Sequence, residues 1–222
     1  EFVVMNTNKN NIYPNKDCNL CPRLFLYRKN NIDNNPNWYN GAVDSFGSIN
    51  SEILIVGLAP GLKGANKTGR PFTGDYAGDL LYNTLIKFGL AKGKYLSIKN
   101  DNLILKNVRI TNSVRCAPPQ NKPNADEKKE CRKFLVSEIK NMKNLKIILS
   151  LGRIAHEEIL KSYKLTLNKF KFNHGSIHKL NNNIKLINSY HCSKYNTQTK
   201  RLTEQMFDNV IKKIVINFGS IN

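Results

Sequence analysis

The sequence has few acidic residues, no long hydrophobic run and no internal repeat. Its 16 Asp and Glu stand against 35 Lys and Arg, which leaves a formal charge of +19. No stretch reaches about 18 consecutive apolar residues, which excludes a transmembrane helix. The segment Glu1–Asn10 lacks the basic-then-apolar pattern of a signal peptide, and residues 1–4, which precede Met5, enter no argument. We therefore expect no membrane association and a cytoplasmic location.

The positive charge has two interpretations. It favours a polyanionic partner, because each Lys or Arg placed on a phosphate releases condensed counterions. It also follows from a general over-use of Lys, Asn and Ile along the chain, such as an AT-rich genome produces. A basic chain is thus compatible with nucleic-acid binding and does not prove it.

Strands and helices alternate along the chain. Short apolar runs predict strands at Glu52–Gly57, Val108–Asn112, Lys146–Gly152 and Ile184–His191, and helical spacing of apolar residues predicts helices at Asp79–Phe88, Asp126–Lys140, Ile154–Tyr163 and Leu202–Ile216. This alternation predicts a three-layer α/β/α sandwich around a central, mainly parallel four-stranded sheet. Because no long linker interrupts the pattern, we expect residues 1–222 to form one domain.

The remaining segments receive structural interpretations. The polar segment Asn30–Asn40 is typical of a surface loop or an insertion. His174 and His178 fall on an expected antiparallel hairpin, and His156 on an amphipathic helix. We expect structural roles for these three histidines.

Polar groups follow several of the predicted strands. In parallel sheets, ligands bind outside the carboxyl ends of the strands. The loop after Gly57, Asn112 at the end of its strand and His191 at the end of another should therefore meet in one crevice. A lone Asn or His means little by itself, and it is the shared edge that makes these residues candidates.

The loop between the first strand and the first helix carries five glycines, at Gly57, Gly61, Gly64, Gly69 and Gly74. Glycine lets backbone N–H groups approach a ligand closely.

Within that loop, the run Gly64–Thr68 resembles a P-loop but lacks the glycine directly before Lys67, which disfavours nucleotide hydrolysis. Phe72 is either an anchor on the core or a stacking platform for a planar base. Asp75 is either the cap of the following helix or a carboxylate directed into the crevice.

Four of the five cysteines form two separated pairs. Cys18 and Cys21 make a C-x2-C pair, and Cys116 and Cys131 lie on a proline-rich loop and the helix after it. These pairs indicate one four-thiolate metal site; disulfides or unrelated free thiols are the weaker alternatives. The spacing does not decide between zinc, the commoner ion, and iron. Cys192 is a fifth thiol, expected to be buried or to line the pocket.

Four ordered blocks span the chain from Cys18 to Phe207. They are Gly57-Leu58-Ala59-Pro60-Gly61, Thr68-Gly69-Arg70-Pro71-Phe72-Thr73-Gly74-Asp75, Asn112-Ser113-Val114-Arg115-Cys116-Ala117-Pro118-Pro119, and Ser189-Tyr190-His191-Cys192-Ser193 with Asn196-Thr197 and Arg201-Leu202-Thr203. Together they resemble the signature blocks of family 5 of the uracil-DNA glycosylase superfamily. The related family 4 usually has Glu where this chain has Leu58. One departure is Cys192, where the family usually has proline, and the change could loosen the following loop.

The resemblance implies a base-excision repair enzyme with the uracil-DNA glycosylase fold. Such an enzyme flips a damaged base, here uracil and potentially hypoxanthine or xanthine, and hydrolyses its N-glycosidic bond to leave an abasic site. It implies that Phe72 stacks on the base, Asn112 bonds to its polar edge and His191 bonds to its O2, with the backbone of Gly57, Ala59 and Gly61 lining the pocket. Since the first block has no polar side chain, Asp75 is the candidate that assists the water or the sugar cation.

The resemblance also implies a four-iron four-sulfur cluster on Cys18, Cys21, Cys116 and Cys131, with zinc as the less favoured occupant. We expect a monomer that acts on double- or single-stranded DNA in the nucleoid. The DNA-contacting residues would be Lys194, Tyr195, Asn196 and Arg201, with Tyr195 or Lys194 as the wedge that fills the vacated stack. The alternative is a non-catalytic, metal-bearing nucleic-acid-binding module, which needs only the charge and the thiols.

Overall fold

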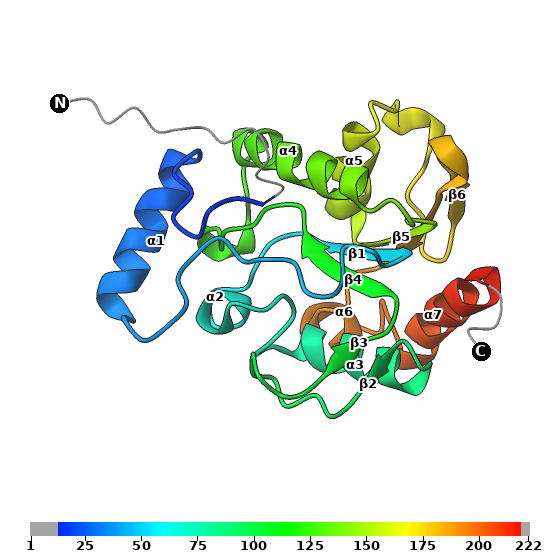
Figure 1. Cartoon of the computed structure of the whole chain (residues 1–222), viewed down its shortest axis with the longest axis horizontal. Helices are drawn as coiled ribbons and strands as arrows, with labels where there is room; N and C mark the ends of the chain where they lie inside the picture. Colours follow the sequence, from blue (N-terminus) through cyan, green and yellow to red (C-terminus); the bar gives the residue numbers. More distant parts are fainter. Residues whose placement is uncertain (1–12, 219–222) are drawn as a thin grey trace.

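A central five-stranded sheet organises the molecule (Figure 1), which is described here from a computed structural model covering residues 13–218. Glu1–Asn10 and residues 219–222 therefore lie outside the described part. The strand order is β4 (Val108–Asn112), β1 (Ile53–Gly57), β5 (Ile147–Leu151), β7 (Lys185–Ser189) and β6 (Ile177–Lys179). The first four are parallel, and β6 pairs antiparallel with β7.

Helices cover both faces of the sheet. Helices α3 (Tyr76–Lys87) and α7 (Glu204–Phe218) lie on one side, and α4 (Ala125–Asn141) and α5 (Arg153–Ser162) on the other (Figure 1). Successive side chains of a strand point to opposite faces, so Ile53 and Ile55 pack in one core cluster and Leu54 and Val56 in the other. Burial on both faces explains why the parallel strands are continuous apolar runs in the sequence. The expected three-layer sandwich is confirmed.

The sheet has five strands, however, and the prediction of four was wrong. The additional strand, β6, has only three residues, and its outer two are exposed. Such a short edge strand carries no buried apolar run. The hairpin expected at its position is present, with His178 on β6.

The strand ends coincide at one edge of the sheet. Gly57 of β1 is in register with Asn112 of β4, and Leu151 of β5 with Ser189 of β7. Strand β7 ends at Ser189, so the prediction that His191 ends this strand was wrong by two residues. His191 lies in the loop that follows, at the same edge.

The helix predictions place the elements correctly and shift their bounds by a few residues. Helix α4 begins with a capping box, in which the Asn124 side chain accepts from the Glu127 N–H (2.8 Å) and Glu127 returns a bond to the Asn124 N–H (2.8 Å). None of the helices within residues 13–218 is long and apolar enough to cross a membrane.

The polar segment Asn30–Asn40 was wrongly predicted as a surface loop. Helix α1 (Pro22–Asn34) runs through its first half, and Asn31 and Asn40 are buried. The Asn40 amide donates to the Asn35 carbonyl (2.8 Å) and accepts from the Asn66 amide (2.9 Å). Two of the three buried residues of α1 are Arg28 and Asn31. The inner face of this helix is therefore polar, and apolar periodicity could not reveal it.

Short elements complete the chain. They are α2 (Ala65–Thr68), α6 (Lys194–Gln198), the antiparallel pair β2 (Ala91–Lys92) and β3 (Ile104–Leu105), and three 3-10 turns at Pro119–Asn121, Leu167–Lys169 and Asn181–Asn183. The segment after His191, expected to be a loop, thus contains the single helical turn of α6. Ser193 begins it, because its hydroxyl accepts from the Asn196 N–H (3.4 Å).

Candidate active site and thiol cavity

Gly57 forms the floor of the candidate active site. A Cβ at this position would lie 2.4 Å from Oδ1 of Asn112 and 2.5 Å from Cζ of Phe72. The amide and the ring can reach the strand end together only because position 57 has no side chain. Ser113 secures the floor, since its N–H (2.9 Å) and its hydroxyl (3.0 Å) both donate to the Gly57 carbonyl.

The Asn112 side chain is buried, and its amide group is available to a ligand. It is 3% exposed, and no described residue forms a hydrogen bond with its amide. Neither amide atom is among the fully buried unpaired atoms of the described residues, so both remain accessible to a ligand. Asn112 therefore offers one donor and one acceptor group to a flat polar ligand.

Phe72 stands beside Asn112 in an uncommon conformation. Its backbone φ is 55°, in the left-handed region that bulky residues avoid. Its ring is buried and runs nearly parallel to the His191 imidazole, with 6.1 Å between centroids and 28° between planes. The strained backbone thus presents a flat apolar face at the crevice.

His191 closes the crevice on the side of β7. Its ring forms no hydrogen bond with the described residues, and desolvation lowers its pKa to about 4. It nevertheless keeps some solvent-accessible surface. Both observations fit a ring at the bottom of a crevice that is open on one side. At neutral pH the imidazole is therefore neutral and offers a single N–H donor.

Asp75 combines the two roles considered for it. Its Oδ1 caps α3 by accepting from the Gly78 N–H (3.0 Å). Its Oδ2 faces the glycine loop, since a Cβ at Gly61 would lie 3.4 Å from it. Burial is the main cause that raises its pKa, and Asp79 adds to the rise while the N–H bonds of Gly78 and Ala77 oppose it. Asp75 is also surface-accessible, which again describes a group in an open crevice.

The segment after His191 lies beside this crevice. Cys192 has no exposed surface, and its thiol donates to the carbonyl of Ala77 in α3 (3.4 Å). The charge of Asp75 contributes to the raised pKa of Cys192, after burial. The Asn196 amide donates to the His191 carbonyl (2.8 Å). These contacts hold the loop in place although it lacks a proline.

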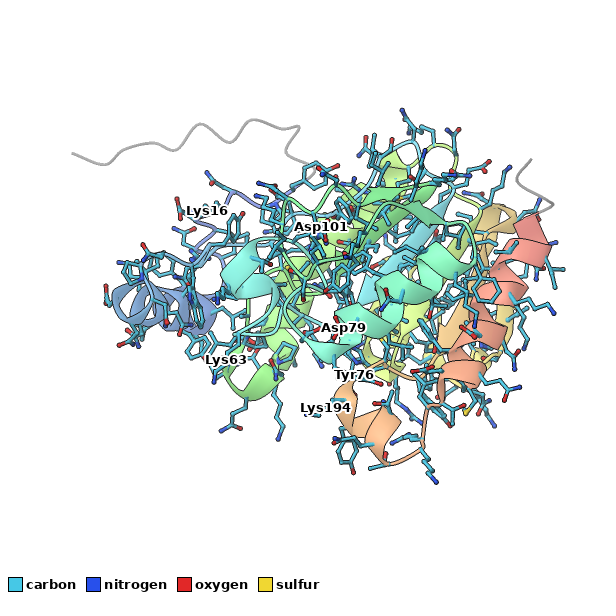
Figure 2. The ribbon with its side chains drawn as sticks, turned by 90° about the horizontal axis from the view of Figure 1, so that it is seen from below. Lys16, Lys63, Tyr76, Asp79, Asp101 and Lys194 are labelled. Atoms are coloured by element: carbon cyan, nitrogen blue, oxygen red, sulfur yellow. The ribbon has the colours of Figure 1, made fainter. Side chains whose placement is uncertain are left out.

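Basic and aromatic side chains lie on the segments next to His191 in the chain. Lys194 is exposed, Tyr195 is 71% exposed, and the Arg201 guanidinium lies 4.9 Å from the centre of the Tyr190 ring. Figure 2 shows Lys63, Tyr76 and Lys194 along one side of the molecule, near the start of α3 and of α6. This side of the molecule therefore carries both positive charge and exposed aromatic rings.

The four paired cysteines line one cavity. Cys18 and Cys21 precede α1, Cys116 follows β4, and Cys131 lies in α4; Leu24, Val114 and Phe134 are among the apolar residues that complete the wall. Two N–H groups point at the sulfurs, from the backbone of Arg115 to Cys131 (3.3 Å) and from the Arg28 guanidinium to Cys116 (3.5 Å). Such N–H···S bonds stabilise ligated thiolates.

A buried ion-pair triad fixes two walls of this cavity. Glu138 of α4 accepts from Arg109 (2.7 Å) and from Arg115, which precedes Cys116. Burial raises the pKa of Cys21 and of Cys116 to about 12, so a cation in the cavity is needed to hold them as thiolates. Within residues 13–218, no three His, Cys, Asp or Glu side chains gather closely enough for a single metal ion.

Three histidines have structural partners, as expected. His156 bonds to the Asn188 side chain and to the Phe170 carbonyl, each at 2.8 Å. His178 bonds to the Lys171 carbonyl (3.0 Å), and His174 accepts from the Tyr190 N–H (3.1 Å).

Sequence reasoning missed several residues that support these sites. They are Arg28 at the thiol cavity, and Tyr82, Tyr95, Ser97 and Asp101 behind Phe72. Only Arg28 had a usable signal, because it lies two helical turns after Cys21. The others come from segments whose proximity no local pattern encodes.

Comparisons with known proteins agree with this geometry. The family model described as "Uracil DNA glycosylase superfamily" matches residues 45–215. A type-5 uracil-DNA glycosylase of Thermus thermophilus is 41% identical over 200 residues, covering 87% of this chain and 90% of the relative. A second, from Pyrobaculum aerophilum, is 32% identical over 209 residues, with 92% and 91% covered. A type-4 enzyme of the same archaeon is 35% identical over 147 residues, with 66% and 61% covered. This chain therefore belongs to the uracil-DNA glycosylase superfamily.

Proposed function

We propose that this protein is a base-excision repair glycosylase of the type-5 kind, which removes uracil from DNA by hydrolysis of the N-glycosidic bond. One observation carries the proposal. The Phe72 ring, the Asn112 amide and the His191 imidazole meet at the end of β1, and neither polar group has a hydrogen-bond partner within residues 13–218. A flipped base matches this arrangement, since it offers a flat face and a polar edge.

The bond breaks with negative charge on the leaving base and positive charge on the sugar. The neutral His191 donates an N–H to the base O2 and stabilises the developing negative charge without delivering a proton. The N–H groups of Ala59 and Gly61 donate to no described residue, so they are free to bond to the same base. Asn112 fixes the base edge, and the Phe72 ring holds its plane.

Asp75 acts on the sugar side. Its Oδ1 is used by the helix cap, and Oδ2 remains on the side of the glycine loop. In the ionised form it orients the attacking water or stabilises the sugar cation. Burial raises its pKa, and the residue keeps exposed surface, which supports a role for its carboxylate towards water or the sugar.

DNA contacts would come from the side of α6. We propose that Lys194 and Arg201 bind phosphates, that Tyr195 enters the vacated stack and that Asn196 holds the loop through the His191 carbonyl. Uracil in double- or single-stranded DNA is the substrate, with hypoxanthine and xanthine as further candidates. We further propose that the enzyme acts as a monomer in the nucleoid, where this substrate is found.

The thiol cavity would hold a four-iron four-sulfur cluster. Cys18, Cys21, Cys116 and Cys131 would be the ligands, because all four line this one cavity. When bound, the cluster supplies a covalent tie between three chain segments. Arg28 and the Arg115 N–H would balance its charge through their bonds to sulfur.

The cluster can be tested by iron content and visible absorbance. Cys131→Ala should lose the iron and lower the stability strongly, because metal binding contributes to folding. The matched control is Cys192→Ala, which should retain the iron, because the buried Cys192 thiol does not line the cavity. Zinc in place of iron in freshly purified protein would contradict the cluster.

The activity can be tested with a uracil-containing oligonucleotide followed by hot alkali. The wild-type protein should cut the strand at uracil, and Asn112→Ala should slow base release by about 10²-fold, the usual loss for a group that stabilises the transition state. The matched control is Asn168→Ala, on a surface turn far along the chain. DNA binding without base release from uracil, hypoxanthine or xanthine would instead favour a non-catalytic binding module.

A further inference from the structure

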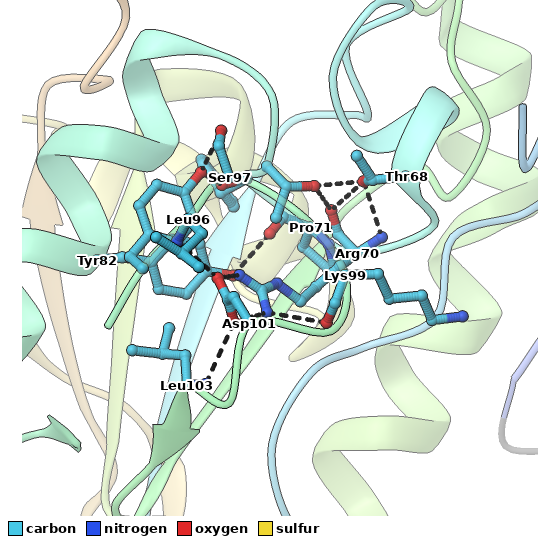
Figure 3. A network of polar contacts seen from close by, with 12 residues as sticks. Thr68, Arg70, Pro71, Tyr82, Leu96, Ser97, Lys99, Asp101 and Leu103 are labelled. Atoms are coloured by element: carbon cyan, nitrogen blue, oxygen red, sulfur yellow. Dashed lines mark hydrogen bonds and ion pairs between the residues drawn. The ribbon is translucent and has the colours of Figure 1, made fainter. Parts of the chain in front are cut away.

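The loop that carries Phe72 is held by hydrogen bonds to its backbone carbonyls. Three consecutive carbonyls each accept from a hydroxyl group: Arg70 from Thr73 (2.7 Å), Pro71 from Tyr82 (2.6 Å) and Phe72 from Tyr95 (3.0 Å). Figure 3 shows this loop beside the segment that contains Leu96, Ser97 and Asp101. A left-handed aromatic residue is strained and persists only where its surroundings fix it.

Tyr95 and Ser97 close a ring of bonds around Thr73. The single hydrogen of the Tyr95 hydroxyl goes to the Phe72 carbonyl, so the bond between Tyr95 and Ser97 (3.1 Å) must be donated by Ser97. The Ser97 oxygen in turn accepts from the Gly74 N–H (2.9 Å). The two hydroxyls thereby hold the chain on both sides of Thr73 and fix the direction in which Phe72 leaves the backbone.

The segment that carries these hydroxyls is itself anchored to the Phe72 loop. Asp101 accepts two bonds from Arg70 (2.7 and 2.8 Å) and the N–H bonds of Leu96 (3.0 Å) and Leu103 (3.2 Å). Leu96 and Ile98, between Tyr95 and Asp101, are each 50% exposed. Apolar packing therefore contributes little at these two positions, and polar bonds tie the segment to the loop.

The first turn of α3 leaves room for this contact. A Cβ at Gly78 would lie 1.9 Å from the Phe72 carbonyl oxygen and 2.4 Å from the Tyr95 hydroxyl. Any other residue at position 78 would separate the two groups. The Tyr95 ring also stacks on Tyr82, with 4.6 Å between centroids, so its hydroxyl reaches the carbonyl from a fixed ring.

We infer that Tyr95 and Ser97 are positioning residues for the base-stacking ring of Phe72, and that they set the rate of base release without touching the substrate. This inference rests on the proposed function. Removal of the Tyr95 hydroxyl leaves its ring stacked and frees the Phe72 carbonyl, so the Phe72 ring shifts relative to Asn112 and His191. A misplacement of up to about 1 Å lowers a rate by about 10- to 100-fold.

The test is a double-mutant cycle with single-turnover base release on uracil DNA. Tyr95→Phe should slow release by about 10-fold or more in the wild-type background. In a Phe72→Leu background it should have no further effect, because no ring remains to be positioned. A general loss of structure would slow both backgrounds alike, and that result would overturn the inference.

Two further variants keep the test decisive. Tyr163→Phe is the matched control, because the Tyr163 hydroxyl is buried and has no partner among the described residues; its release rate should equal that of the wild type. If Tyr95→Phe does not fold, Ser97→Ala replaces it and should reproduce the slower release and the cycle. An unchanged rate in an active protein would overturn this inference alone, whereas a wild-type protein with no base release would overturn the proposed function as well.

Discussion

Two aspartates close to one loop have opposite surroundings. Asp101 is buried and accepts bonds from the two terminal nitrogens of the Arg70 guanidinium and from two backbone N–H groups. Although its burial opposes ionisation, these bonds lower its pKa to about 2. Asp75 has no cationic partner among the described residues, and its pKa is raised. One carboxylate is satisfied by the fold, and the other keeps its charge available.

The comparison distinguishes residues that stabilise the fold from residues that act in the reaction. A buried charge with its partners stabilises one arrangement of the chain, and its removal should affect folding. A carboxylate that has only backbone N–H partners, as Asp75 has, contributes less to the fold, and its removal should affect the reaction. The same contrast holds between Tyr163, whose hydroxyl has no partner, and Tyr95, whose hydroxyl bonds to the Phe72 carbonyl.

The largest expected effect is a loss of stability when Asp101 loses its ion pair with Arg70. Arg70→Met preserves the aliphatic stem and leaves Asp101 buried without its counter-ion, so the free energy of unfolding should fall by about 3–5 kcal/mol. Denaturant titration measures it. Arg201→Met, which removes an exposed guanidinium, is the control and should change stability by less than about 1 kcal/mol. Equal losses of unfolding free energy in the two variants would contradict the distinction between the buried ion pair and an exposed charge.

Asp75→Asn should show the reverse pattern. Base release should fall by about 10²-fold or more, whereas stability should stay unchanged or rise. The amide oxygen can still cap α3, and the variant removes a charge whose pKa burial raises. Single-turnover kinetics and thermal unfolding measured on one preparation decide. A stable variant with the wild-type rate would remove Asp75 from the mechanism.

The smallest expected effect is in the pH profile. The rate should fall on acidification as Asp75, whose pKa burial raises above its usual value, takes up a proton, and His191 should charge near its own pKa of about 4. The acid limb should therefore disappear in Asp75→Asn. An acid limb that survives unchanged in this variant would assign the titration to a group other than Asp75.

Stability should also depend on His191. Its pKa is about 4 in the folded protein and near 6.5 when unfolded, so between these values the unfolded chain binds more protons. The free energy of unfolding therefore includes a contribution that is complete above about pH 6.5 and is lost as the pH falls toward 4. Comparison of wild-type unfolding with that of His191→Gln isolates this contribution.

Regular apolar periodicity made the main strands and helices predictable from the sequence. Elements whose inner face is polar or exposed could not be predicted in this way. The strand that ends at Gly57 and the one that ends at Asn112 were evident because both of their faces are buried and apolar. Helix α1 was missed because its inner face carries the buried polar residues Arg28 and Asn31. The edge strand β6 was missed because most of it is exposed. That residues 1–222 form one domain stays a prediction.

The sequence by itself determined the sandwich, the shared strand edge and the four thiols that line one cavity, because strand alternation and residue type are local properties. Only the tertiary structure decided which polar groups have hydrogen-bond or ion-pair partners. Whether Asp75 or Asp101 meets an arginine, whether Asn112 keeps a free amide, and whether a tyrosine hydroxyl holds Phe72 depend on contacts between distant segments. Sequence separation carries no record of those distances, and the chemistry of this site is set by them.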